Sequence, residues 1–154
     1  MTYRPFLAIT MGDSAGIGPE VVAKTLIDES IYGKCIPFVI GNAEAMSAAF
    51  KLIGSNVSVK KISSIQNIEA SSDKIDVLDE GNLDFSKIDY GQISAESGKA
   101  SVDWILKAGE LAASGQVQAI STAPINKEAC NLAGHKDIGH MEIFQSQTGV
   151  SQVA

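Results

Sequence analysis

Cysteine is scarce in this chain, which excludes a fold stapled by disulfides. The 154 residues contain two cysteines, Cys35 and Cys130, whereas small secreted scaffolds depend on several pairs. The two thiols form no C-x-x-C pair, and their spacing to the two histidines is not that of a zinc site. We therefore expect two reduced, buried thiols in a cytosolic protein.

Basic and aromatic residues are also few, which argues against nucleic acid as a partner. Twelve lysines and arginines stand against 18 aspartates and glutamates, the formal net charge is −6, and aromatic residues make up 6%. Such a chain repels a phosphate backbone and offers few rings for base stacking. The densest basic stretch is the pair Lys60-Lys61, so no basic patch offsets the acidic balance.

Long apolar runs are missing as well. The first apolar run covers residues 6–9, which is too short for the core of a signal peptide or for a membrane span. We expect a cytoplasmic protein without a membrane partner. An apolar fraction of 45% and a charged fraction of 19% are typical of a globular protein, and the length alone predicts one domain.

Short apolar segments alternate with helical patterns along the chain. Strands are predicted at residues 6–10, 36–40, 57–62, 75–78 and 117–120. Helices are predicted from Pro19, from Asn42 to about 53, from Ser94 or Ser97 to about Ser114, and over 125–133 and 140–148. The longest of these helices should bury Ala100, Trp104, Leu106, Ala108 and Leu111. Residues 63–74 and 79–93 are read as surface excursions, and the alternation predicts an α/β fold with a mainly parallel sheet.

A glycine-rich turn (residues 12–18, the glycine turn) joins the first predicted strand to the first helix. Ligands in open α/β sheets bind beyond the carboxyl ends of the strands, and glycines let the backbone approach a ligand closely. Its G-x-x-x-G-x-G spacing is neither a Walker A loop nor the dinucleotide fingerprint. Gly12, Asp13 and Gly16 are thus candidates for lining a cleft, and a tight turn without a ligand is the equally simple alternative.

A second segment (residues 121–127, the Thr-Ala-Pro segment) follows the last predicted strand. Thr122, Asn126 and Lys127 offer a hydroxyl, an amide and a cation, which suit an anionic ligand. The alternative is that Pro124 opens the next helix and that Lys127 is solvated.

The two histidines, His135 and His140, do not form a metal pair on a helix, because they are five residues apart with Gly139 between them. His140-Met141-Glu142 matches the H-x-E of zinc deaminases, but the P-C-x-x-C that must follow is missing. His140 can instead donate to a phosphate or hydroxyl group at a helix start. The alternative is a surface or capping histidine.

Taken together, three segments closely resemble one family. Residues 9–20, 122–129 and 133–144 are similar, in order and separation, to the 4-hydroxythreonine-4-phosphate dehydrogenase family of pyridoxal phosphate biosynthesis. The resemblance implies a three-layer α/β/α fold in two subdomains, like that of isocitrate and isopropylmalate dehydrogenases. It further implies a homodimer that uses NAD and a divalent metal (Zn, Mg, Co or Mn). The implied reaction oxidises a four-carbon, 4-phosphorylated hydroxy acid, whose β-keto product then loses CO₂.

The resemblance also suggests where substrate binds. The family's Gly-His-Thr-Glu motif falls on residues 139–142, so His140 and Met141 take the two substrate-binding positions, although Met141 lacks the expected hydroxyl. Ser14 stands where the family has proline. Residues 124–129 look closer to a branch that acts on threonate or erythronate 4-phosphate. Neither the motifs nor their spacing assigns a catalytic residue.

Chains of this family are much longer than 154 residues. We therefore expect residues 1–154 to be the N-terminal part of a two-subdomain dehydrogenase and to be inactive alone. The resemblance places the metal ligands beyond residue 154, and no NAD contact is assigned within the chain. Residues 150–154 are read as the start of another strand. Two alternatives remain: a non-catalytic α/β module that binds a phosphorylated metabolite, and a fragment without a function of its own.

Overall fold

The computed structural model describes residues 3–136 and 139–151. Within these ranges strands and helices alternate, as the sequence predicts. The elements are β1 Phe6–Thr10, α1 Gly18–Leu26, β2 Ile36–Ile40, α2 Ala43–Leu52, β3 Ser58–Ile62, β4 Lys74–Leu78, α3 Ala95–Ala113, β5 Ala119–Thr122, α4 Lys127–Leu132 and α5 His140–Thr148. Short 3-10 helices lie at Glu29–Gly33, Ile65–Asn67 and Phe85–Lys87.

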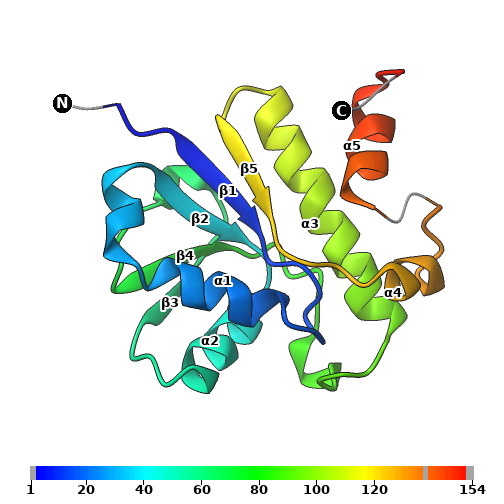
Figure 1. The fold of residues 1–154 in the computed structure, drawn as a ribbon, viewed down its shortest axis with the longest axis horizontal. Coiled ribbons are helices and arrows are strands. Elements are labelled where there is room, and N and C mark those ends of the chain that lie inside the picture. The colour runs from blue at the N-terminus through cyan, green and yellow to red at the C-terminus, as the bar shows by residue number, and fades with distance from the viewer. Residues whose placement is uncertain (1–2, 137–138, 152–154) are drawn as a thin grey trace.

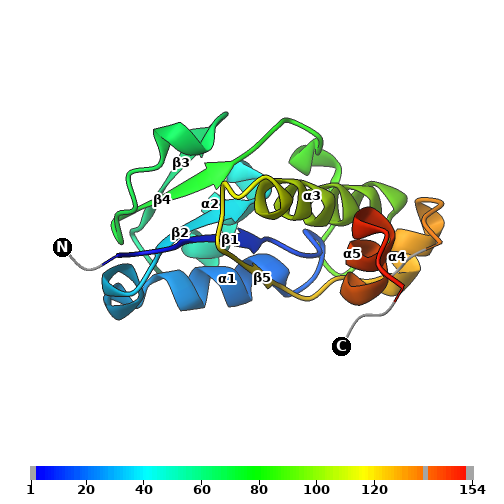
Figure 2. The ribbon, with the colours of Figure 1, turned by 90° about the horizontal axis from the view of Figure 1, so that it is seen from above.

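The strands form one parallel sheet in the order β3-β4-β2-β1-β5 (Figure 1). Helices α1 and α2 pack beside each other on one face, and α3 lies across the other (Figure 2). Helices α4 and α5 pack against α3. The predicted three-layer α/β/α fold with a parallel sheet is therefore confirmed. No helix in the described ranges is both long and apolar enough to span a membrane.

The core lies between the sheet and its helices, and most residues predicted to be buried are buried. Phe38 of β2 is fully buried and Trp104 of α3 is 2% exposed. Leu106 was predicted inside but is 36% exposed, because two helical positions turn it about 200° away from Trp104. Cys130 is buried, as expected, whereas Cys35 is only partly buried, and both are free thiols.

Several boundaries differ from the prediction by one or two residues. Strand β5 begins two residues later than expected, and α4 begins at Lys127 because the side chain of Asn126 caps it. By contrast, β1, β2 and α5 have the predicted bounds. Val150 and Ser151 are not in a strand, and the rest of the strand predicted there lies outside the described residues.

The connections define a topological switch point beside β1. From β1 the chain passes through α1 to β2 on one side, whereas from β4 it passes through α3 to β5 on the other side. The two crossovers use opposite faces of the sheet. Ligands of open α/β sheets bind in the crevice that such a reversal leaves at the carboxyl ends of the strands. In this chain the reversal lies between β1 and β5, so the candidate site is at the carboxyl ends of these two strands.

Candidate functional site

The glycine turn and the Thr-Ala-Pro segment meet at this switch point. The backbone N–H of Asp13 donates to the carbonyl of Pro124 over 2.9 Å, and that of Ala123 donates to Thr10 over 3.1 Å. Gly12 has a φ of +75°, and a Cβ there would overlap the Pro124 carbonyl oxygen. The close approach of the two segments therefore requires glycine at position 12.

Helix α1 begins at the glycine turn with an open N-terminus. Its N-cap residue, Ile17, makes no side-chain cap hydrogen bond, and Pro19 occupies the first turn. The N–H groups of this turn can therefore hold an anionic group. Asp13 stiffens the turn instead of extending from it, since its Oδ1 accepts from the N–H of Ala15 over 3.0 Å. Gly16 is exposed beside it.

In the Thr-Ala-Pro segment the predicted cleft residues have different surroundings. Asn126 Oδ1 accepts the backbone N–H of Ala129 over 3.0 Å and caps α4. Lys127 is exposed, and its ammonium has no ion-pair partner among the described residues. Thr122 ends β5 and is partly buried. Lys127 is thus the charge in this segment that an anionic ligand can use, while the Asn126 amide oxygen is already engaged.

Replacing Asn126 with alanine should lower the free energy of unfolding by about 1 kcal/mol, because α4 loses its N-cap. Asn126→Asp, which keeps a capping oxygen, should cost much less. Urea denaturation of the protein expressed from its complete gene measures both values. If Asn126→Ala leaves stability unchanged but weakens substrate binding, Asn126 contacts ligand and the capping role is wrong.

His140 is the first residue of α5 and is half-buried beside Ala123. Burial lowers the pKa of its imidazole, and the Ala123 carbonyl and the Glu142 carboxylate oppose this shift. Its Nε2 is buried without a hydrogen-bond partner among the described residues. A neutral imidazole has one donor and one acceptor nitrogen, so His140 is suited to pair with a hydroxyl group. Met141 is 45% exposed next to it.

Unpaired polar atoms concentrate around this site. In the described part of the chain, four buried side-chain atoms lack a hydrogen-bond partner: Thr10 Oγ1, Ser14 Oγ, Asp76 Oδ1 and His140 Nε2. Asp76 nevertheless has the Lys60 ammonium at 3.7 Å. The other three lie at the end of β1, in the glycine turn and beside Ala123. Buried polar groups in proteins are usually paired, so these three unpaired atoms single out the switch point as the candidate site.

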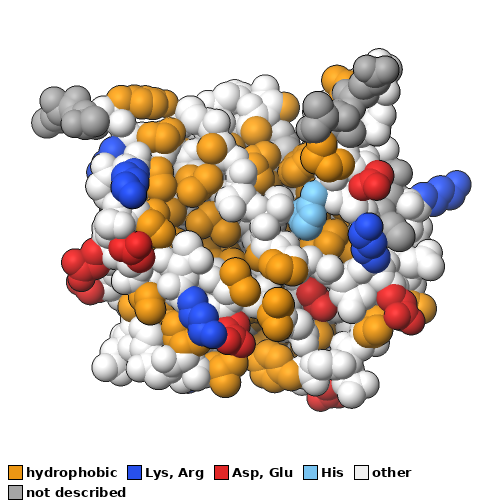
Figure 3. Space-filling model, viewed as in Figure 1, with side chains coloured by type: hydrophobic (Ala, Val, Ile, Leu, Met, Phe, Trp, Pro, Cys, Tyr) orange, Lys and Arg blue, Asp and Glu red, His pale blue; other side chains and the backbone are white. Residues whose placement is uncertain are grey.

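An apolar groove of about 130 Å³ borders the site on the α1 side of the sheet. Its walls include Leu7 and Ile9 of β1, Val21 and Thr25 of α1, and Thr122. Apolar side chains gather over this part of the surface in Figure 3. Charge for an anionic ligand must therefore come from other groups, namely Lys127 and the open end of α1.

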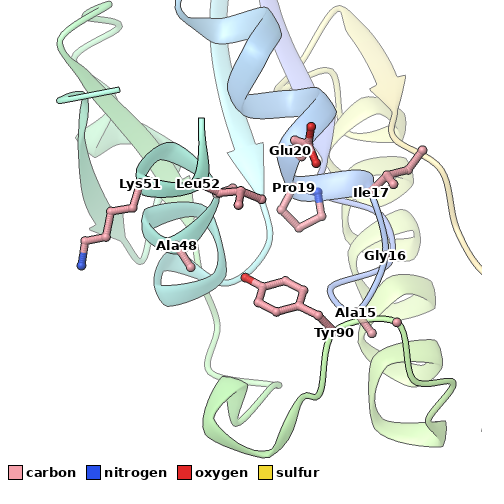
Figure 4. Close-up of a pocket in the computed structure, with 11 residues that line it drawn as sticks. Ala15, Gly16, Ile17, Pro19, Glu20, Ala48, Lys51, Leu52 and Tyr90 are labelled. Carbon is pink, nitrogen blue, oxygen red and sulfur yellow. The ribbon is translucent and has the colours of Figure 1, made fainter. Parts of the chain in front are cut away.

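A cavity of about 820 Å³ lies on the other side of the glycine turn (Figure 4). Pro19 and Leu52 form part of its apolar wall, and the Tyr90 ring extends between α2 and the turn. The N–H of Gly91 donates to the Ala15 carbonyl over 2.7 Å and fixes this loop to the turn. Sequence reasoning missed Tyr90, because residues 79–93 carry no periodic pattern that places them near the turn.

The described residues contain no group of three or more His, Cys, Asp or Glu side chains placed to hold a metal ion. No metal ligand can therefore be assigned among them. The expectation that such ligands follow residue 154 stays a prediction.

The parallel sheet and the glycine turn at its switch point define the chain as an α/β protein with a candidate ligand site at the carboxyl ends of its strands. The family model described as "Pyridoxal phosphate biosynthetic protein PdxA" matches residues 33–154. The chain belongs to this family, and the resemblance stated from its motifs is confirmed.

Similar proteins carry related names. A protein of Symbiobacterium thermophilum named "Putative D-threonate 4-phosphate dehydrogenase" is 38% identical over 149 residues, which cover 97% of this chain and 44% of that protein. The "D-threonate 4-phosphate dehydrogenase" of Cupriavidus necator is 38% identical over 152 residues, which cover 99% and 45%. The chain thus spans about half the length of the curated relatives it matches.

Solved structures agree with this fold. A 4-hydroxythreonine-4-phosphate dehydrogenase from Burkholderia phymatum matches with a TM-score of 0.94 and 40% identity, covering 98% of this chain and 46% of that one. A terephthalate 1,2-cis-dihydrodiol dehydrogenase from Burkholderia xenovorans matches with a TM-score of 0.67 at 22% identity, over 86% of this chain and 38% of that one. The second likeness supports the fold alone.

Proposed function

We propose that this chain is the N-terminal part of a dehydrogenase that oxidises a four-carbon, 4-phosphorylated hydroxy acid with NAD and a divalent metal. Membership of the PdxA family and the names of the similar proteins support this reaction class. The observation that carries it is the meeting of the glycine turn, the Thr-Ala-Pro segment and His140 at the switch point. The complete protein is proposed to work as a cytoplasmic homodimer.

The residues present fit a phosphate-bearing ligand. A Cβ at Gly12 would overlap the Pro124 carbonyl oxygen and one at Gly18 would overlap the Met11 carbonyl oxygen, so glycine at both positions keeps the turn tightly folded beside the proposed ligand site. The open N-terminus of α1 and the Lys127 ammonium then offset its negative charge. His140 Nε2, buried and unpaired, is proposed to hydrogen-bond a substrate hydroxyl and so orient the carbon chain.

When bound, NAD would supply the hydride acceptor and the metal a Lewis acid for the reacting oxygen. Among the described residues no donor set fits the metal, so we derive no step through it. This chain's own residues bind the phosphorylated acid, orient it and exclude water from one side of it.

The substrate is proposed to be threonate or erythronate 4-phosphate in preference to 4-hydroxythreonine 4-phosphate. The relatives named after D-threonate 4-phosphate support this choice. Residues 124–129 support it as well, because their sequence looks closer to the branch of the family that acts on threonate or erythronate 4-phosphate.

A screen for NADH formation tests this proposal. The protein from the complete gene, supplied with a divalent metal, is assayed at 340 nm with 4-hydroxythreonine, threonate and erythronate 4-phosphates. We expect the highest kcat/KM with threonate or erythronate 4-phosphate, and none with the unphosphorylated acids. Binding of these phosphates without NADH formation would contradict the proposal and favour a non-catalytic binding module.

A further inference from the structure

One face of α3 contacts both segments that line the candidate site. Gly98 and Ser101 lie three residues apart, so they share this face of the helix. The hydroxyl of Ser101, which is 1% exposed, lies 3.2 Å from the Gly12 carbonyl and 2.8 Å from that of Ser97. The helix thus reaches the glycine turn through one buried hydroxyl.

At Gly98 the same face touches the start of α4. A Cβ on Gly98 would overlap the Ala129 carbonyl and would lie 2.6 Å from the backbone nitrogen of Cys130. Glycine therefore lets α4, and with it the end of the Thr-Ala-Pro segment, lie directly on α3. Helix α3 is the common support of the two segments.

The peptide between Gly12 and Asp13 is held at both ends. In a trans peptide the C=O and the N–H point in opposite directions. Here the Ser101 hydroxyl shares its one proton between the carbonyls of Ser97 and Gly12, while the N–H of Asp13 donates to the Pro124 carbonyl. The peptide plane is therefore clamped between α3 and the Thr-Ala-Pro segment, and this fixes how the rest of the turn presents its N–H groups.

We propose that Ser101 is a positioning residue for the substrate site. It does not touch the ligand but fixes the orientation of the Gly12 carbonyl, and through it the glycine turn against the Thr-Ala-Pro segment. This inference rests on the proposed function, because its kinetic consequence needs a phosphorylated substrate at the turn. A displacement of the glycine turn by about 1 Å would lower substrate affinity and the reaction rate.

The test compares Ser101→Ala with Ser97→Ala in the protein from the complete gene. Ser97 is the matched control: it is fully buried on the same helix, and its hydroxyl donates to the Ser94 carbonyl over 3.2 Å without touching the turn. Each variant loses one buried hydroxyl. We expect Ser101→Ala to raise KM for the phosphorylated acid by about 3- to 10-fold, in line with one hydrogen bond. Its kcat should change less, and Ser97→Ala should stay near wild type.

Hydrogen exchange of the Asp13 amide gives a readout that does not depend on activity. Freeing the Gly12 carbonyl should loosen the peptide and speed Asp13 exchange in Ser101→Ala but not in Ser97→Ala. Ser101→Cys, whose thiol is a weak donor of similar shape, should fall between wild type and Ser101→Ala in both measurements.

The outcomes separate the two proposals. Equal KM values and equal Asp13 exchange in Ser101→Ala and Ser97→Ala would overturn the role of Ser101, even in an active enzyme. A wild-type protein that forms no NADH from any phosphorylated acid would overturn the proposed function, and with it the kinetic role. In that case faster Asp13 exchange in Ser101→Ala would still show that the clamp exists.

Discussion

Replacing Gly12 with alanine is expected to lower the free energy of unfolding by about 2–5 kcal/mol and to remove most of the proposed dehydrogenase activity of the complete protein. The φ of +75° costs an alanine about 1–2 kcal/mol. The new Cβ would also overlap the Pro124 carbonyl oxygen and lie 3.0 Å from the carbonyl carbon of Ala123. Both obstacles are backbone atoms that cannot rotate aside, so overpacking adds about 1–3 kcal/mol. Relief of this clash would push the glycine turn away from the Thr-Ala-Pro segment and open the site.

Gly115→Ala is the matched control for this prediction. Gly115 has nearly the same φ, +74°, but among the described residues other than its own chain neighbours no atom lies within 4 Å of its Cβ position. The free energy of unfolding of Gly115→Ala should therefore fall only by the cost of a left-handed backbone for alanine, about 1–2 kcal/mol, and this variant should keep its activity. Urea denaturation and the NADH assay on both variants measure the difference. Equal losses of stability with activity retained in both would show that the segments do not depend on their contact at Gly12.

The elements that local patterns specify were predicted closely. The apolar runs at β1 and β2 are bounded by a glycine turn and by Gly41, so their ends could be read directly. Asn42 caps α2 with its side chain, and Gly54, with a φ of +71°, follows the helix as a stop signal should. In each case the decisive interaction lies within a few residues of the element.

Features that depend on distant contacts were missed or misplaced. Leu106 and Trp104 lie about 200° apart on α3, so one helix face cannot bury both, and packing against the sheet decides that Trp104 is the buried one. Ser101 meets Gly12 across 89 positions of sequence, and no local signal distinguishes it from Ser97. A glycine inside a helix lowers helix stability, and only the close contact between Gly98 and the backbone of α4 explains its presence in α3.

The candidate site shows the same division. Its place at the carboxyl ends of two strands followed from the order of strands and glycines, and the structure does bring the two segments together. The role of each side chain at the site could not be predicted from the sequence. Asn126 has the same type of group as a ligand-binding amide, yet its oxygen caps α4. Composition can supply candidate groups, but the hydrogen bonds already made by the fold decide which remain available.

His140→Ala should lower kcat/KM for the phosphorylated acid by about 10-fold or more, equivalent to about 1.4 kcal/mol of transition-state stabilisation. The reason is that Nε2 of His140 is buried, unpaired within the described residues and beside Ala123 at the switch point. His135→Ala is the control, because His135 lines a separate small cavity with Leu106 and Gln147. It should leave kcat/KM within about 2-fold of wild type. Equal effects of the two substitutions would remove His140 from the substrate site.

The same variant tests the protonation state of His140. Burial holds its pKa below the value of about 6.5 that an exposed histidine has in the unfolded chain. Between the lower pKa of the folded state and pH 6.5, the unfolded state therefore binds more protons at His140 than the folded state does. The stability that neutral His140 contributes is present above pH 6.5 and is lost as the pH falls through the pKa of the folded state. Wild-type protein should therefore lose stability over this interval more steeply than His140→Ala. The kcat/KM of the wild-type protein should fall over the same pH interval, because a protonated imidazole has no acceptor nitrogen for a substrate hydroxyl. Parallel stability curves for the two proteins would show that His140 is not held neutral by the fold.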